Sequence, residues 1–287
     1  MKAKLPFFID AIVLASAVII CLPLRMLQYG DGIEVYTGFY TNFGINFIIF
    51  YAVLAAAIIY FIVSSLLKRN KFHLDTSAAK FPGCGVFSAL TSLAVLYSAF
   101  QSYSLKERET AAYVVSSKVP EIVFLLQEFF AILSAVFFLI LAISLLTGKD
   151  SSRFRILALC PVVWNILRLV LHFTVTVSYT RVSDLMLDML ALAFYSVFFM
   201  AFAQSNSGIN SEGAVWRLTV FGLGGALLGL ICFIPRAVLL VMGRGTQIFV
   251  LSTADVSDLA IALFCVSTVL TRLVPGKTDE RVEEKTE

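Results

Sequence analysis

Charged side chains are scarce in this chain of 287 residues. Asp, Glu, Lys and Arg make up 14% of it, whereas hydrophobic residues make up 59%, and the mean hydropathy is +0.90. Soluble domains carry about 25% charged and 45–50% apolar residues. The composition therefore argues against a soluble globular protein and predicts an integral membrane protein.

Sequence signatures of common enzymes are also missing. The chain has only two histidines and contains no HExxH, GxSxG, Walker A or glycine-rich dinucleotide motif. We therefore expect neither serine nor metal catalysis, and no cofactor. A membrane enzyme that acts on a lipid through paired carboxylates stays open as the least favoured of three hypotheses.

Cysteine pairs with metal-binding or redox spacing are absent as well. The five cysteines form no CxxC motif, their number is odd, and at least three lie within apolar runs. This pattern predicts small core residues rather than a disulfide framework or a metal site. The five are Cys21, Cys84, Cys160, Cys232 and Cys265.

Long apolar runs are the dominant feature that is present. Such runs predict transmembrane helices, whereas a membrane barrel would show alternating segments of about ten residues. We expect an all-α bundle, residues 1–274, followed by a charged and disordered tail, 275–287. The first run resembles a signal peptide but continues past the candidate cleavage motif at 15–17, so we interpret it as an uncleaved span. Eight spans are predicted, at about 5–24, 43–67, 84–104, 120–147, 154–178, 183–205, 214–242 and 251–273.

Basic residues orient these spans. With the N-terminus in the cytoplasm, 14 of the 22 Lys and Arg residues fall on the cytoplasmic side, six fall outside, and Arg168 and Arg236 lie within spans. The positive-inside rule therefore predicts that both termini are cytoplasmic. Because the net charge of +3 is explained by the loops, no nucleic-acid partner is expected.

Polar residues within the spans give the main functional hint. At 1.5 Å of rise per residue, His172 and Asp188 both lie about 12 Å below the outer helix ends and could pair across a hairpin. Glu128, Arg236 and Asp258 fall at a similar depth, and Arg168 lies one turn deeper. Trp164, Asn165, Arg168 and His172 share one stripe of the fifth span, because they are three or four residues apart.

Ionised groups at this depth cost about 2.5–3.5 kcal/mol each unless they are paired or face water. We therefore predict a polar cavity in the outer half of the bundle, with two further acids, Asp184 and Asp255, as simple helix N-caps. The candidate ligand-binding residues are Glu128, Trp164, Asn165, Arg168, His172, Asp188, Arg236 and Asp258.

The leading hypothesis is that the cavity binds a small polar or charged solute, for transport or sensing. Arg168 and Arg236 would hold an anionic group, the carboxylates would hold cationic groups or couple protons, and Trp164 would form an apolar wall. The alternative hypothesis is a structural or assembly subunit in which the intramembrane charges only stabilise the bundle. Gly225 and Gly229 form a small-residue face for close helix packing, within the chain or against a partner or second copy.

Three stretches of the second half carry a family resemblance: 161–169 (PVVWNILRL), 216–218 (WRL) and the glycine-rich run that ends at Pro235 and Arg236. In these stretches the chain resembles a set of uncharacterised multi-pass membrane proteins of clostridial-type bacteria. The resemblance implies a bacterial cytoplasmic membrane as the location. It implies no known activity, so no functional residue is taken from it.

Overall fold

The computed structural model describes residues 5–34, 39–41, 44–68, 72–74, 80–112, 121–148, 152–174, 184–207, 211–245 and 254–275. Long helices dominate these residues, as the apolar runs predict. In chain order the elements are α1 (Leu5–Asp31), α2 (Ile45–Lys68), β1 (Phe72–Leu74), α3 (Pro82–Ala112), α4 (Glu121–Thr147), the 3-10 helix η2 (Ser152–Leu159), α5 (Cys160–Thr174), α6 (Asp184–Asn206), α7 (Ser211–Val241), α8 (Val256–Arg272) and β2 (Leu273–Pro275).

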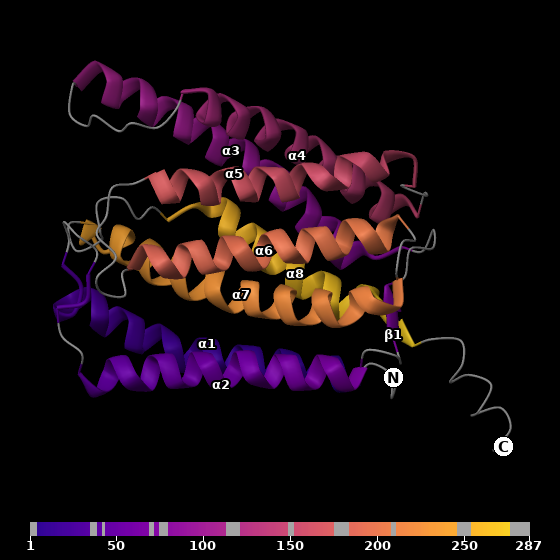
Figure 1. The fold of residues 1–287 in the computed structure, drawn as a ribbon, viewed down its shortest axis with the longest axis horizontal. Coiled ribbons are helices and arrows are strands. Elements are labelled where there is room, and N and C mark those ends of the chain that lie inside the picture. Colours follow the sequence, from indigo (N-terminus) through magenta and orange to yellow (C-terminus); the bar gives the residue numbers. More distant parts are fainter. Residues whose placement is uncertain are drawn as a thin grey trace, which may run out of the picture.

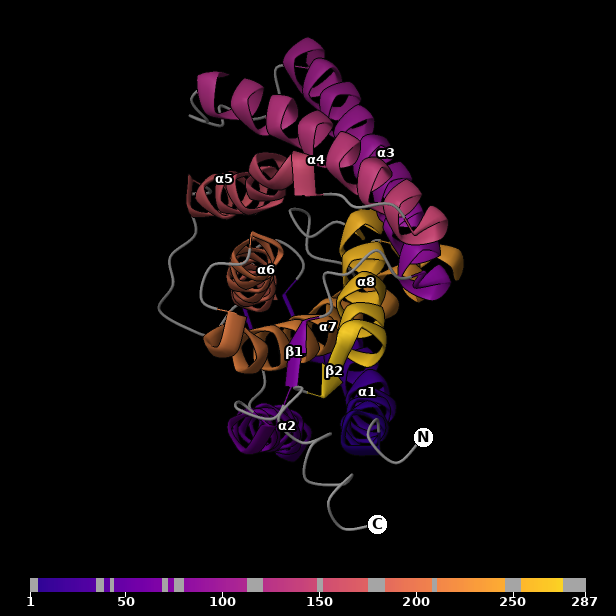
Figure 2. The ribbon, with the colours of Figure 1, turned by 90° about the vertical axis from the view of Figure 1, so that its right-hand side faces the viewer.

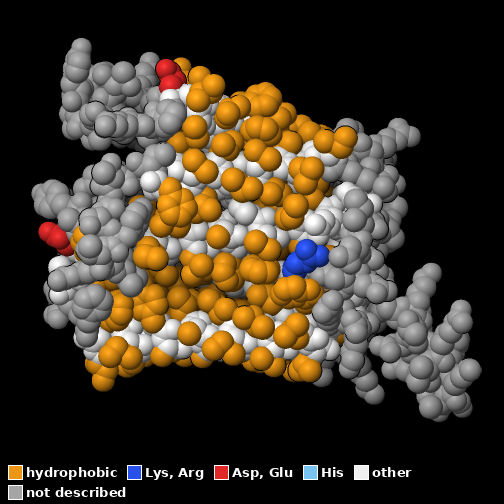
Figure 3. Space-filling model, in the orientation of Figure 1, with side chains coloured by type: hydrophobic (Ala, Val, Ile, Leu, Met, Phe, Trp, Pro, Cys, Tyr) orange, Lys and Arg blue, Asp and Glu red, His pale blue; other side chains and the backbone are white. Residues whose placement is uncertain are grey.

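Seven helical segments, in α1 to α7, are long and apolar enough to cross a membrane. The eighth helix, α8, has 17 residues, which is the short end of the range for a span. Hydrophobic side chains cover the middle of the visible face (Figure 3). The start of α1 and the end of α8 lie at the same end of the bundle (Figure 1), as an even number of crossings requires.

The helices form a central group with a pair on either flank. Figure 2 shows α3 and α4 on one side of α5 to α8, and α1 and α2 on the other. Helix α7 packs against α1, α2, α6 and α8, so it lies at the centre of the molecule. Its Leu223, Leu227 and Ile231 are fully buried.

The glycines of α7 make room for aromatic side chains of α6, among them Tyr195. The Tyr195 ring packs closely against Gly225, since a Cβ added there would be only 3.0 Å from the ring, and the Tyr195 hydroxyl lies directly against Gly229. The close approach predicted for the Gly225 and Gly229 face is thus made within the chain. All five cysteines are buried, as expected for core residues.

Some boundaries differ from the predicted spans. Helix α1 continues to Asp31, beyond the end predicted at residue 24, because Arg25 and Gln28 find polar partners inside the bundle. The fifth span divides into η2 and α5, and α8 begins at Val256 rather than near 251.

A short antiparallel pair of strands was not predicted. Strand β1 follows α2 and pairs with β2 directly after α8, with His73 opposite Val274. Pro275, which we assigned to the tail, belongs to β2. The remainder of the predicted tail, 276–287, lies outside the described residues.

Candidate functional site

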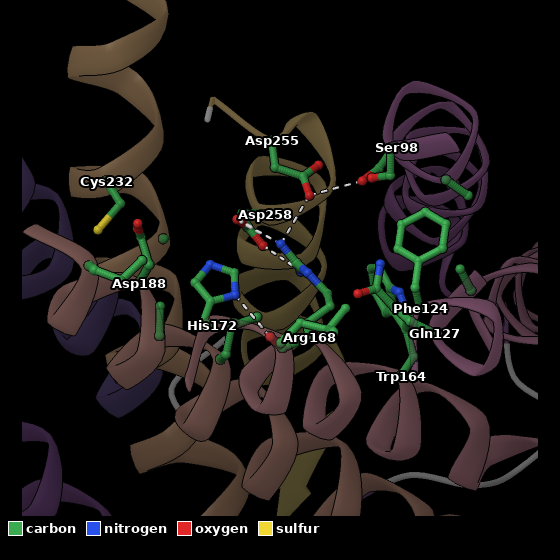
Figure 4. Close-up of a pocket in the computed structure, with 18 of the residues that line it drawn as sticks. Ser98, Phe124, Gln127, Trp164, Arg168, His172, Asp188, Cys232, Asp255 and Asp258 are labelled. Atoms are coloured by element: carbon green, nitrogen blue, oxygen red, sulfur yellow. Dashed lines mark hydrogen bonds and ion pairs between the residues drawn. The ribbon is translucent and has the colours of Figure 1, made fainter. Parts of the chain in front are cut away.

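A cavity of about 270 Å³ lies between helices α3 to α8, in the half of the bundle away from the start of α1. At about 30 Å³ for each water molecule, it has room for roughly nine waters or a small solute. Figure 4 shows the polar side chains that converge on it. Six of them belong to the predicted site or its caps: Arg168, His172, Asp188, Arg236, Asp255 and Asp258.

The first polar cluster joins α5 to the start of α8. Arg168 Nη1 donates to Asp258 Oδ1 over 2.8 Å, and Nη2 donates to Asp258 Oδ2 over 3.2 Å and to Asp255 Oδ2 over 3.0 Å. The guanidinium also lies 5.0 Å from the ring centre of Trp164, one helical turn earlier on α5. Two-pronged contacts of this kind fix the direction of an arginine as well as neutralising it.

The two carboxylate oxygens of Asp255 accept hydrogen bonds from different groups. It is the N-cap of α8, and its Oδ1 accepts from the backbone N–H of Ser257 over 2.8 Å. Its Oδ2 accepts from Arg168 and, over 2.9 Å, from the Ser98 hydroxyl of α3. The predicted capping role is therefore confirmed for Asp255, and the same side chain also belongs to the cavity wall.

The second polar cluster joins α6, α7 and α1. Arg236 donates to both oxygens of Asp188, over 2.9 and 2.8 Å, and to Asp184 Oδ2 over 2.9 Å. Its Nε donates to the Tyr29 hydroxyl over 2.8 Å. Arg25 donates to the other oxygen of Asp184, so this buried carboxylate binds two arginines. We favoured a capping role for Asp184, and its carboxylate proves to be the centre of an ion-pair cluster.

Sequence reasoning missed the α1 side of this cluster. Arg25 lies just beyond the first predicted span, which ends at residue 24, but Arg25, Tyr29 and Tyr40 are all buried. Arg25 also donates to the hydroxyl of Tyr40 and to Gln28. The spacing of Arg25, Gln28 and Tyr29 by three and four residues is the signal of one polar helix stripe, and it could have revealed this face.

The two clusters differ in which groups reach the cavity. The side chains of Asp258, Asp255 and Asp188 are 26%, 17% and 14% exposed, whereas those of Arg168 and Arg236 are 9% and 3% exposed. The wall thus presents carboxylate oxygens more than guanidinium groups. When Arg25 and Asp184 are included, the ion pairs of the two clusters contain three arginines and four aspartates. The two clusters together therefore carry an excess of negative charge when these groups are ionised.

Six of the eight predicted site residues line the cavity, and two do not. Glu128 lies beside it and accepts from Gln127 Nε2 over 3.2 Å, and it is Gln127 that lines the cavity. Asn165 is fully buried and donates to the carbonyl of Pro161, one turn earlier in the same helix. The structure therefore corrects the placement of Glu128 and Asn165.

His172 and Asp188 both line the cavity but bond to different groups. His172 Nδ1 lies 2.9 Å from the backbone carbonyl of Arg168. Asp188 is bound by Arg236 through both oxygens. The predicted pairing of these two side chains across the hairpin is replaced by these contacts.

A third polar cluster lies at the other end of the bundle. The buried carboxylate of Asp10 in α1 pairs with Lys68 of α2 and accepts from the Ser64 hydroxyl over 2.7 Å. This ion pair connects α1 to α2. Within the described residues, no three His, Cys, Asp or Glu side chains are grouped so that they could hold a metal ion.

No protein-family model, curated protein or solved structure matches this chain. The resemblance to clostridial-type membrane proteins therefore stays a prediction. A function can be assigned only from the geometry and charge of the cavity itself.

Proposed function

We propose that this membrane protein binds a small organic cation in its polar cavity, for transport or for sensing. The observation that supports this proposal is the unequal exposure of the two signs of charge. Three carboxylates reach the cavity from α6 and α8, while both arginines beside them are largely covered. A volume of about 270 Å³ suits a solute of only a few non-hydrogen atoms.

The roles of the site residues follow from the contacts. Asp258 and Asp188 offer acceptors to the cation, and Ser98 and Gln127 add neutral polar groups to the wall. Phe124 provides an aromatic face, which attracts cations. An anion-binding role for Arg168 and Arg236 loses support, because each guanidinium already binds two carboxylates.

The same cluster offers a way to convert binding into helix movement. Arg168 ties α5 to the start of α8, and it bonds to the two partly exposed aspartates that a cation would approach. A cation at Asp258 competes with Arg168 and weakens this tie. Such a ligand shifts the population between two helix arrangements in proportion to its difference in affinity for them.

A structural role is the second candidate function. It is favoured by the pairing of each cavity arginine with two aspartates, since a purely stabilising network would be built in this way. In that case the cavity has no ligand and the two clusters serve only to hold helices together.

Thermal unfolding in detergent with a series of cations separates these functions. We expect ammonium, methylammonium, dimethylammonium or tetramethylammonium chloride to raise the melting temperature relative to an equal concentration of sodium chloride. Saturation at 100 times Kd stabilises a protein by about 2.7 kcal/mol. The rise should disappear in Asp258→Asn, and it should persist in Glu121→Gln, an exposed carboxylate at the start of α4. An equal rise in wild type and Asp258→Asn, or no rise with any of the four cations, would contradict the cation site.

A further inference from the structure

A second, apolar groove lies on the other side of the α5 and α6 hairpin. It has a volume of about 490 Å³, and helix α2 supplies its opposite wall through Tyr51. The hairpin contributes the remaining lining residues: Leu169, Phe173, Met186, Leu187, Met189, Leu190 and Ala193. Three of these, Phe173, Met186 and Leu190, are 61%, 42% and 39% exposed, so the groove opens on the surface that faces the bilayer.

Consecutive residues of the hairpin point into the two spaces. Arg168 and His172 line the polar cavity, and the next residues, Leu169 and Phe173, line the groove. On α6, Asp188 lines the cavity and Leu187 lines the groove. A rotation of about 100° for each residue in a helix produces this separation. The hairpin therefore has a charged face toward the cavity and an apolar face toward the groove.

The types of side chain that line the groove indicate what kind of molecule fits it. Closely packed transmembrane helices are enriched in Gly, Ala, Ser and Thr where they meet, but Ala193 is the one small residue among the lining side chains. The others are Leu, Met, Phe and Tyr, and unbranched methionine adapts to irregular apolar shapes. Such a lining suits a flexible hydrocarbon chain better than a rigid helix.

We propose that an acyl chain of a membrane phospholipid binds in the groove between α2, α5 and α6. Tyr51 and Phe173 are within about 10 Å of the outer ends of their helices, and Ala193 is about 14 Å deep. The groove thus begins near the headgroup level and descends toward the bilayer centre, in the direction that an acyl chain takes.

A hydrogen-bonded chain leads from this groove to the polar cavity. The hydroxyl of Tyr51 donates to that of Tyr40 over 3.3 Å, and Tyr40 accepts from Arg25. Arg25 pairs with Asp184, which also binds Arg236, and Arg236 binds the cavity residue Asp188. The lipid site is independent of the cation proposal, but these contacts place it where its occupant touches the same polar network.

Native mass spectrometry of the whole protein tests the lipid site. The protein in detergent is incubated with palmitoyl-oleoyl phosphatidylglycerol, and the detergent is then removed in the gas phase. We expect wild type to retain a stoichiometric phospholipid and Ala193→Trp, which fills the groove, to lose most of it, a several-fold decrease in occupancy. Ala56→Trp on the exposed face of α2 is the matched control and should retain the lipid.

Leu190→Asn is the second variant, because it makes the groove polar without filling it. It should also lower the lipid occupancy several-fold while the protein remains monodisperse. Equal lipid retention in wild type, Ala193→Trp and Leu190→Asn would overturn the proposal. So would wild type that retains no lipid, or that retains a polypeptide in place of lipid.

Discussion

At the scale of single residues, Asp184 and Asp258 differ in how much the fold depends on them. Asp184 is fully buried and accepts from Arg25, Arg236 and Tyr29. Asp258 is partly exposed to the cavity, and its partner Arg168 keeps a second carboxylate, Asp255. Removing one partner of a buried pair leaves an uncompensated charge, whereas removing an exposed one leaves a charge that water can reach.

We therefore predict that Asp184→Asn destabilises the protein by about 3–5 kcal/mol. Asp258→Asn should cost clearly less. Unfolding in a titration of SDS in mixed micelles, followed by circular dichroism, measures both. Equal losses of stability for the two variants would show that burial does not determine how strongly the fold depends on each carboxylate.

The sequence predicted the depth of the polar residues better than their direction. Counting residues from the helix ends brought Asp188, Arg236 and Asp258 to one level, and the structure places all three at the cavity wall. The same count cannot tell Gln127 from Glu128, because adjacent residues differ by 1.5 Å in height but by about 100° around the helix. Arg25 was missed because an arginine at the end of an apolar run resembles a charged flank.

At the scale of elements, Tyr195 of α6 packs against the glycine face of α7. Its buried ring lies against Gly225, and its hydroxyl lies against Gly229 and donates to the backbone carbonyl of Asp258 over 3.2 Å. One aromatic side chain therefore joins α6, α7 and α8 beside the cavity. A side chain added at Gly229 would have to displace it.

We predict that Gly229→Ala lowers stability by about 1–3 kcal/mol through overpacking, although alanine is the better helix former. Tyr195→Phe in the Gly229→Ala background should restore part of the loss, because it removes the hydroxyl that clashes. Gly83→Ala in α3 is the control, since nothing lies within 4 Å of a Cβ there. Melting temperatures of the three variants and of wild type provide the test. A loss that Tyr195→Phe does not reduce would contradict the assigned clash.

The helices could be predicted from the sequence, and the strands could not. Apolar runs of 18 or more residues have few other solutions in a membrane. Strand β1 has three residues in a short loop, and its partner begins only at Leu273, so no local pattern announces the pairing. Tertiary contacts of this kind depend on where the helices bring distant segments.

At the scale of the whole molecule, the two ends of the bundle differ in chemistry. The end with the cavity carries the aspartates and arginines of the first and second polar clusters. The other end carries the Asp10 and Lys68 pair and the two strands. The excess of basic residues in loops predicts that the second end faces the cytoplasm. This orientation remains a prediction.

Thiol labelling with a membrane-impermeant maleimide checks the orientation. Arg244→Cys, just after α7, should be labelled in intact cells. Thr147→Cys, at the last residue of α4 and at the other end of the bundle from Arg244, should be labelled only after the membrane is permeabilised. The native cysteines are buried, so wild type should give a low background. The reverse pattern would invert the topology.

The ion pair between Arg25 and Asp184 can form only late in synthesis of the chain. The two residues are 159 positions apart, and chains grow at about 5–20 residues per second, so the arginine is made roughly 8–30 s before its carboxylate. During that interval α1 holds an uncompensated charge, which long side chains accommodate by reaching up to the headgroups. We therefore expect the first helix to take its final depth in the bilayer only after the sixth helix has been inserted.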